Sequence, residues 1–145
     1  MKKIVLTTGL LMLSIGLAHA DPIAERQALM KDMGRAVGSV AKIAQGQQEF
    51  DAAKVNAAFE TLAADAQKID ADALFPEGTE TGGDTEASPK IWEDRADFVA
   101  QIDKFKADTA AAVEANPQDL ASFQTQFKSV AANCASCHQS YRVKR

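Results

Sequence analysis

Residues 120–141 read LASFQTQFKSVAANCASCHQSY. Apolar side chains recur in this segment at steps of three and four residues, which is the period of an amphipathic helix. The four residues before it, Asn116-Pro117-Gln118-Asp119, have the composition of a helix start. We expect Asn116 as the N-cap, Pro117 at the first helical position, and Asp119 returning a hydrogen bond as in a capping box. The apolar stripe of the predicted helix consists of Leu120, Phe123, Phe127, Val130, Cys134, Cys137 and Tyr141.

Two upstream segments show the same period. The first predicted helix covers residues 22–47, with Pro22 in its first turn and Gly46 at its exit. The second begins after the expected N-cap Asp51 and continues to about residue 74. Their apolar stripes are Ile23, Met30, Met33, Val37, Val40 and Ala44 in the first helix, and Val55, Phe59, Leu62, Ala66 and Ile69 in the second.

Residues 75–87 are rich in Pro, Gly, Thr and acidic side chains, and predict a long connection. Ser88 and Pro89 then open another helix, Ser88 as its N-cap and Pro89 at its first helical position. The stripe of that helix is Ile91, Phe98, Ile102, Phe105 and Val113. Since no segment shows the sustained alternation of a strand, the predicted fold is all-α, an antiparallel four-helix bundle formed by residues 21–145 as one domain.

The first 20 residues differ in composition from the rest. Lys2 and Lys3 precede an apolar run over residues 4–17, and Ala18-His19-Ala20 offers small residues to signal peptidase. An uncleaved membrane anchor is the alternative, but the run is shorter than the ~20 residues that cross a bilayer. We expect residues 1–20 to be a cleaved signal peptide, and the mature chain to be exported to the periplasm.

Charge excludes some classes of protein. Lys2 and Lys3 are the only charged side chains among the first 20 residues, which leaves 14 Lys and Arg against 20 Asp and Glu in the mature chain. Nucleic-acid binding needs a basic surface and is not expected. No second apolar run is long enough to span a membrane. The acidic surface would favour encounter with a basic patch on a partner.

Residues 134–138, Cys-Ala-Ser-Cys-His, have the pattern of c-type haem attachment. At positions i, i+3 and i+4 of a helix, two thiols and an imidazole lie on one face. Cys134 and Cys137 would add to the two vinyl groups of one haem, and His138 would be the proximal axial ligand of its iron.

Three other readings of this motif are less favoured. A disulfide between Cys134 and Cys137 would close too small a loop to stabilise the fold. A thioredoxin-like pair would lie at the N-terminus of a helix, whereas this pair lies near the end of the last one. A zinc site would lack a fourth ligand, because the only other histidine, His19, belongs to the predicted signal peptide.

Residues 134–142, CASCHQSYR, resemble the cytochrome c' family, the class II c-type cytochromes. Residues 81–84 (TGGD) followed by 89–94 (PKIWED), and Arg26-Gln27 in the first predicted helix, also resemble that family. The resemblance implies a haem inside the bundle, with Arg142 near the proximal imidazole. It also implies that Arg26, Gln27 and Asp84 contact the haem or its propionates, since an arginine is suited to pair with a carboxylate.

By the same resemblance, Met30 corresponds to the distal position of the haem. A bulky apolar residue there leaves the iron five-coordinate in high-spin members, whereas methionine resembles the low-spin branch, in which a thioether is the sixth ligand. We therefore expect His138 and Met30 as axial ligands of an electron-transfer haem. One alternative is that Met30 and Met33 only fill the core.

Two further functions remain open. A distal site without a methionine ligand would bind nitric oxide or another small gas. A haem enzyme such as a peroxidase is least favoured, since no histidine remains as a distal acid or base.

Small side chains on the first two predicted helices bear on assembly. Such residues allow another helix to approach closely, and the family resemblance implies a homodimer through these two helices. Redox proteins are the other expected partners. The small residues are Ala28, Ala36, Ala41, Ala57 and Ala58.

Overall fold

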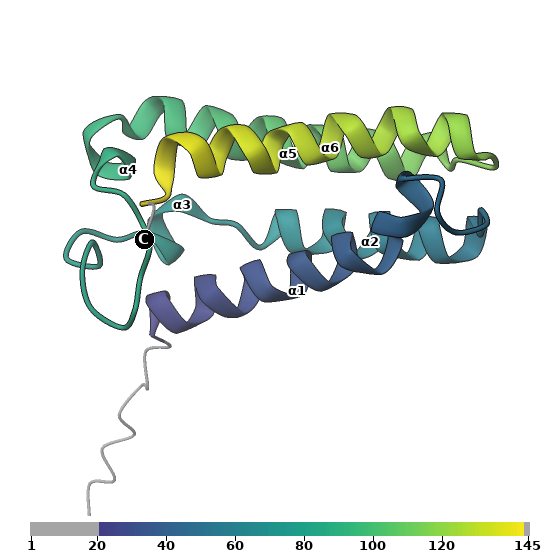
Figure 1. Ribbon diagram of the computed structural model, residues 1–145. Coiled ribbons are helices and arrows are strands. Elements are labelled where there is room, and N and C mark those ends of the chain that lie inside the picture. Colours follow the sequence, from purple (N-terminus) through teal and green to yellow (C-terminus); the bar gives the residue numbers. More distant parts are fainter. Residues whose placement is uncertain (1–20, 144–145) are drawn as a thin grey trace, which may run out of the picture.

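The computed structural model describes residues 21–143, so the predicted signal peptide at residues 1–20 lies outside the described part of the chain. The helices are α1 Pro22–Ala44, α2 Ala52–Gln67, α3 Ala71–Leu74, α4 Lys90–Glu93, α5 Arg95–Ala115 and α6 Leu120–Tyr141. The four long helices α1, α2, α5 and α6 run alternately up and down, which confirms the predicted all-α, four-helix bundle (Figure 1). None of the described helices is long and apolar enough to cross a membrane.

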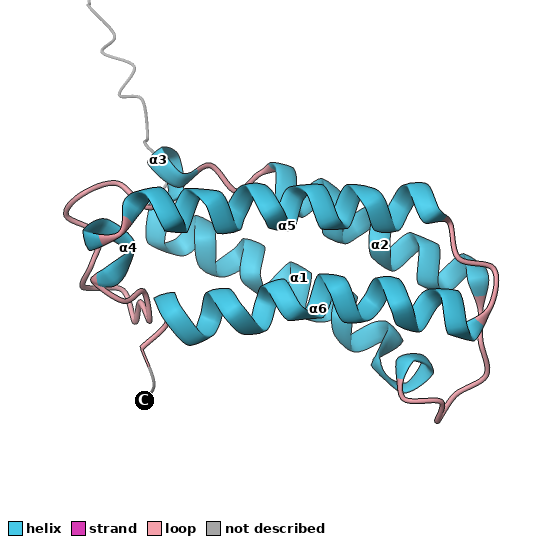
Figure 2. Cartoon of the chain, turned by 90° about the horizontal axis from the view of Figure 1, so that it is seen from above, coloured by secondary structure: helices cyan, strands magenta, loops and turns pink. Residues whose placement is uncertain are grey.

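The long helices form two layers, α1 with α2 and α5 with α6 (Figure 2). Helix α2 also packs against α5, and α6 packs more lightly against α1. The short helices α3 and α4, with the connection between them, lie at the end of the bundle where α1 begins and α6 ends (Figure 1). The long connection is thus placed beside the C-terminal turns of α6.

Aspartate side chains begin three of the long helices. The carboxylates of Asp21, Asp51 and Asp119 accept hydrogen bonds from backbone N–H groups of the first turns of α1, α2 and α6. Asp51 was predicted in this role. The expectation for Asn116 is wrong: it ends α5 in the left-handed conformation (φ 40°, ψ 61°), and Asp119, not Asn116, is the N-cap of α6. Asparagine tolerates this conformation, and Pro117 cannot continue a helix.

The second predicted helix ends at Gln67 instead of residue 74. The carboxylate of Asp70 accepts hydrogen bonds from the backbone N–H groups of Asp72 and Ala73, and so starts the separate helix α3.

The third predicted helix is interrupted at Asp94 (φ −124°, ψ 54°), which separates α4 from α5. Side chains on both sides of the break donate to the carbonyl oxygen of Phe75, the Trp92 indole at 3.1 Å and the Arg95 guanidinium at 3.4 Å. The cap expected at Ser88 is one residue too early: α4 begins at Lys90 with Pro89 as its N-cap, although the Oγ of Ser88 accepts a hydrogen bond from the N–H of Lys90 at 3.3 Å.

The core row of α1 differs from the predicted stripe. The buried α1 side chains include Leu29, Met33, Ala36, Val40 and Ile43. Of the six predicted residues only Met33 and Val40 are in this row, whereas Met30, Val37 and Ala44 lie on the side turned towards α6. The predicted stripe therefore mixed the buried face of α1 with its neighbouring face.

Aromatic side chains fill the core at both ends of the bundle. The ring of Phe123 lies 5.6 Å from that of Phe59 between α6 and α2. At the other end, Phe98 lies 4.9 Å from Phe75 and 5.1 Å from Tyr141, with edge-to-face geometry. This second cluster joins the last turn of α6 to α5 and to the start of the long connection.

Candidate haem site

The three residues of the attachment motif lie in the last two turns of α6. Cys134 and Cys137 are free thiols, half-buried against the core. Burial raises the pKa of both thiols, to about 11 for Cys137. Burial, assisted by the charge of Arg142, lowers the pKa of His138. At neutral pH the imidazole is therefore uncharged, which is the form that binds iron, and the thiols lack the low pKa of a thioredoxin-like pair.

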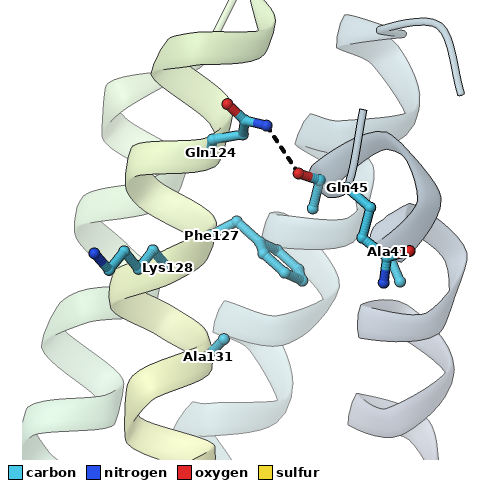
Figure 3. Close-up of a pocket in the computed structure, with 7 residues that line it drawn as sticks. Ala41, Gln45, Gln124, Phe127, Lys128 and Ala131 are labelled. Atoms are coloured by element: carbon cyan, nitrogen blue, oxygen red, sulfur yellow. Dashed lines mark hydrogen bonds between the residues drawn. The ribbon is translucent and has the colours of Figure 1, made fainter. Parts of the chain in front are cut away.

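A groove of about 380 Å³ separates the C-terminal half of α1 from α6 (Figure 3). The ring of Phe127 points from α6 across this groove (Figure 3). The side-chain amide of Gln124 donates to the carbonyl oxygen of Ala44 at 2.9 Å and fixes the two helices at the same level. The groove is lined by Ala41, Ala44, Gln45, Gln124, Phe127, Lys128 and Ala131.

Met30 and His138 lie on the same sides of α1 and α6 as the residues that line the groove. Met30 shares one side of α1 with Ala41, and His138 shares one side of α6 with Phe127, because each pair is eleven residues apart, close to three helical turns. The helices are antiparallel, so the N-terminal direction of α1 and the C-terminal direction of α6 lead from the groove towards the same end of the bundle. Eleven residues correspond to about 16 Å along each helix, which brings Met30 level with His138. The axes of α1 and α6 diverge towards this end (Figure 1).

Met30 is unusually exposed for a large apolar residue. Its side chain is 37% exposed, and Val143 is the other large hydrophobic residue exposed among residues 21–143. Met33, one turn away, is 7% exposed and belongs to the core. The two methionines thus have different environments, and only Met30 is available to a group placed between α1 and α6.

Arg26 is a buried cation that forms no direct ion pair with a described carboxylate. Its side chain is only 4% exposed, and none of the ion pairs among residues 21–143 includes it. Its guanidinium donates to the carbonyl oxygens of Leu74 and Thr79 at 3.0 and 2.7 Å, and to the hydroxyls of Thr79 and Thr85 at 2.9 and 2.6 Å. Burial lowers the pKa of Arg26, and the charges of Asp21 and Glu80, which raise it, do not offset this. Because a buried cation without a directly paired carboxylate is costly, Arg26 fits a haem propionate nearby.

Gln27 and Asp84, which were predicted as haem contacts, lie at the same end of α1. The side-chain amide of Gln27 donates to the carbonyl oxygen of Gly83 at 3.0 Å. Gly83 and Asp84 both have left-handed backbone conformations (φ 52° and 56°). A Cβ atom on Gly83 would lie 3.1 Å from Ile23, so glycine permits this close approach of the loop to α1. The structure thereby brings Arg26, Gln27 and Asp84 together.

Arg142, which the resemblance places near the proximal imidazole, directly follows α6, and its backbone N–H donates to the carbonyl oxygen of His138 at 3.3 Å. It forms an ion pair with Glu86. The backbone around this pair is also joined, since the N–H of Ser88 donates to the carbonyl oxygen of Tyr141 at 2.9 Å and that of Val143 to Glu86 at 2.8 Å. The long connection therefore holds the end of α6 from one side.

The sequence did not reveal how Tyr141 holds α6 from the other side. Its hydroxyl donates to the carboxylate of Asp97 on α5 at 2.6 Å, and its ring is 3% exposed. This hydrogen bond lowers the pKa of Asp97. Glu86 and Asp97 carry no sequence signal for these roles, since each lies more than 40 residues from its partner. Only the place of Tyr141 on the apolar stripe pointed to its burial.

The attachment motif on the last turns of a helical bundle defines this molecule as a helical c-type cytochrome. Comparison with known proteins gives the family. Residues 21–142 match the family model described as Cytochrome C', and the chain belongs to the cytochrome c' family. It is therefore an electron-transfer haem protein with one covalently bound haem c and its iron.

Three relatives illustrate the match. Cytochrome c' of Rhodopseudomonas palustris is 40% identical over 99% of this chain and 97% of the relative, and its solved structure gives a TM-score of 0.80, covering 87% and 98% of the two chains. Cytochrome c-556 of Agrobacterium tumefaciens strain B2A is 39% identical over 87% of this chain and all of the relative. A cytochrome c' described as having an unusual ligand-controlled dimer dissociation is 30% identical, with a TM-score of 0.77, and covers 89% and 99% of the two chains.

Proposed function

We propose that this cytochrome carries electrons through a haem whose iron is bound by His138 and Met30. One feature supports the proposal: helical spacing from the groove residues Ala41 and Phe127 brings Met30 level with His138, on the side of α1 that faces α6. When bound, the haem supplies the one-electron couple of its iron, and a methionine ligand tends to raise the potential. We propose no enzymatic reaction.

The chain's own residues would hold this group rigidly. Thioethers at Cys134 and Cys137 would fix the ring plane relative to the imidazole of His138. Arg26 would offset the charge of a propionate at the buried end of α1. The contacts of Tyr141 and Arg142 with α5 and the connection hold the last turn of α6 from two sides. Such restraint keeps rearrangement small when an electron enters or leaves.

The absorption spectrum of the reduced protein tests the ligand set. We expect sharp low-spin bands that carbon monoxide does not change. Met30→Ala should open the site and give broad, carbon monoxide-sensitive bands. Met33→Ala is the matched control: it should keep the low-spin spectrum while lowering the free energy of unfolding by about 2–4 kcal/mol, because Met33 is in the core. Low-spin bands in the spectrum of Met30→Ala would show that Met30 is not an iron ligand.

A five-coordinate, gas-binding cytochrome is the second candidate. It is favoured by the exposure of Met30, which leaves this side chain free to turn away from the bundle. The iron would then bind nitric oxide or another small gas on the open side. Broad high-spin bands in the unmodified protein, shifting when gas is added, would establish this function in place of the first.

We also propose that the protein acts in the periplasm after removal of residues 1–20. The basic start, apolar run and small residues at positions 18–20 support export. Mass spectrometry of the protein from a periplasmic extract should give a chain beginning at Asp21 with the added mass of one haem. A chain that retains residues 1–20 would contradict the proposal.

A homodimer through α1 and α2 is proposed as the assembly. A second groove, of about 530 Å³, lies between these helices. Three of the small residues predicted to mediate contact, Ala36, Ala57 and Ala58, line it, whereas Ala41 lines the groove towards α6. The groove is completed by Asp32, Arg35, Ser39, Lys54, Thr61 and Asp65.

Asp65 supports this choice of face. It is 4% exposed, and its Oδ1 accepts a hydrogen bond from Lys68 at 2.7 Å. Its Oδ2 has no hydrogen-bond partner among the described residues. A buried carboxylate oxygen without a donor is destabilising. A second subunit bound at the groove would supply the hydrogen-bond donor that the single chain lacks.

A further inference from the structure

Acidic residues are unevenly distributed over this acidic protein. Residues 33–48 and 120–143 contain no Asp or Glu, although the chain has 20 of them. These two segments are the C-terminal part of α1 with its following turn, and α6 with the two residues after it. They lie side by side along the groove between α1 and α6 (Figure 3).

The charge that lines this groove is positive. Lys128 is the charged residue among the groove-lining side chains. It takes part in no ion pair among residues 21–143, in contrast to Lys68 and Lys104, each of which pairs with an aspartate. The acidic net charge of the molecule therefore does not describe this face, whose lysine is not neutralised by a carboxylate.

The groove is also adjacent to the attachment site. Ala131, which lines it, precedes Cys134 by one helical turn on the same side of α6. Its floor is apolar, formed by Phe127 and the alanines, and its rim carries Gln45, Gln124 and Lys128. An apolar centre with a polar rim is the composition of a protein–protein contact.

We infer that the groove between α1 and α6, with Lys128 on its rim, is the surface on which a redox partner docks, and that the partner presents carboxylates around its own redox centre. Opposite charges would orient the two proteins with their redox groups close together. This differs from the expectation based on net charge, which was a basic patch on the partner. The inference rests on the proposed electron-carrying function.

Two small redox reagents of opposite charge test the surface without a known partner. Oxidation of the reduced protein is followed by stopped flow, with hexacyanoferrate(III) as the anion and tris(phenanthroline)cobalt(III) as the cation. One electron passes from the protein to each reagent, giving hexacyanoferrate(II) or cobalt(II). For the variant Lys128→Glu at low ionic strength, the rate constant with the anion should fall about fivefold and that with the cation should rise. Both changes should vanish in high salt.

The matched control is Lys106→Glu, which makes the same charge change as Lys128→Glu but on α5, diagonally opposite α1 in the bundle. It should alter the rates less than twofold. Equal effects of the α5 and groove variants would overturn the inference, because net charge alone would then govern the rates. A protein that exchanges electrons with neither reagent would instead refute the proposed function.

A second readout does not use electron transfer. Poly-glutamate peptide added to the isotopically labelled protein should shift the NMR signals of the backbone amides of residues 41–45 and 124–131. Lys128→Glu should abolish these shifts, and Lys106→Glu should leave them. Shifts spread evenly over the surface, or confined to α5, would overturn the docking site.

Discussion

Arg26 combines a buried positive charge with four hydrogen bonds to one loop. It therefore has two roles, holding residues 74–85 against α1 and offering a charge to the haem site. The sequence predicted the second role from the family resemblance. The first could not be predicted, because the four acceptors, two backbone carbonyl oxygens and two threonine hydroxyls, lie 48–59 residues away along the chain.

Removal of Arg26 should destabilise both the fold and the loop. Arg26→Ala leaves the buried carbonyl oxygens of Leu74 and Thr79 without donors, which should cost about 2–4 kcal/mol in the free energy of unfolding. It should also speed proteolysis within residues 76–85. Denaturant titration and limited proteolysis measure the two effects. Lys31→Ala, an exposed lysine on α1, is the control and should change neither.

Among the helices, starts were predictable to within a few residues, whereas breaks were not. Asp51 acts locally, through a hydrogen bond to the N–H group three residues ahead, so the sequence was sufficient to place it. The caps expected at Ser88 and Asn116 lie one and three residues before the observed ones. The break at Asp94 is associated with the hydrogen bonds that Trp92 and Arg95 donate to the carbonyl oxygen of Phe75. This acceptor lies 17 and 20 residues away from the two donors, so no local pattern indicates the break. The attachment residues were predictable for the same local reason, since one helical turn brings Cys134, Cys137 and His138 together.

The contact between α5 and α6 through Tyr141 and Asp97 should make stability depend on pH. The pKa of Asp97 is lowered in the folded protein, so the contribution of the ionised carboxylate is complete above its unfolded pKa, near 4, and is lost as pH falls through the folded value. Tyr141→Phe should therefore destabilise the protein at pH 7 and lose most of this effect at about pH 2. Urea unfolding at both pH values measures the difference.

Asp97→Asn supplies the control for that experiment. Since asparagine carries no ionisable proton, Tyr141→Phe in the Asp97→Asn background should have nearly the same effect at both pH values. A pH-dependent effect that persists in this background would assign the titration to another group.

As a whole, the molecule presents two grooves on opposite sides of α1, one towards α2 and one towards α6. We assign the first to a second copy of the chain and the second to a redox partner. The two faces use different residues, so dimer formation and electron exchange can be altered separately.

The dimer should be sensitive to charge introduced at its centre. Ala57→Glu places a carboxylate in the groove between α1 and α2, and two such groups would meet across a twofold axis. We expect the dissociation constant to rise tenfold or more. Sedimentation equilibrium measures it, with Ala107→Glu on α5 as the control that should leave the dimer intact. A monomeric unmodified protein would refute the assembly.

Trp92 is the only tryptophan of the chain, and its indole is hydrogen bonded to Phe75 beside the end of α6. In so small a bundle its fluorescence emission lies within range of energy transfer to a porphyrin. The fluorescence of Trp92 therefore reports on maturation of the protein. It should be weak once the cofactor is attached, strong while the cofactor is missing, and shifted to longer wavelength when this end of the bundle opens to water.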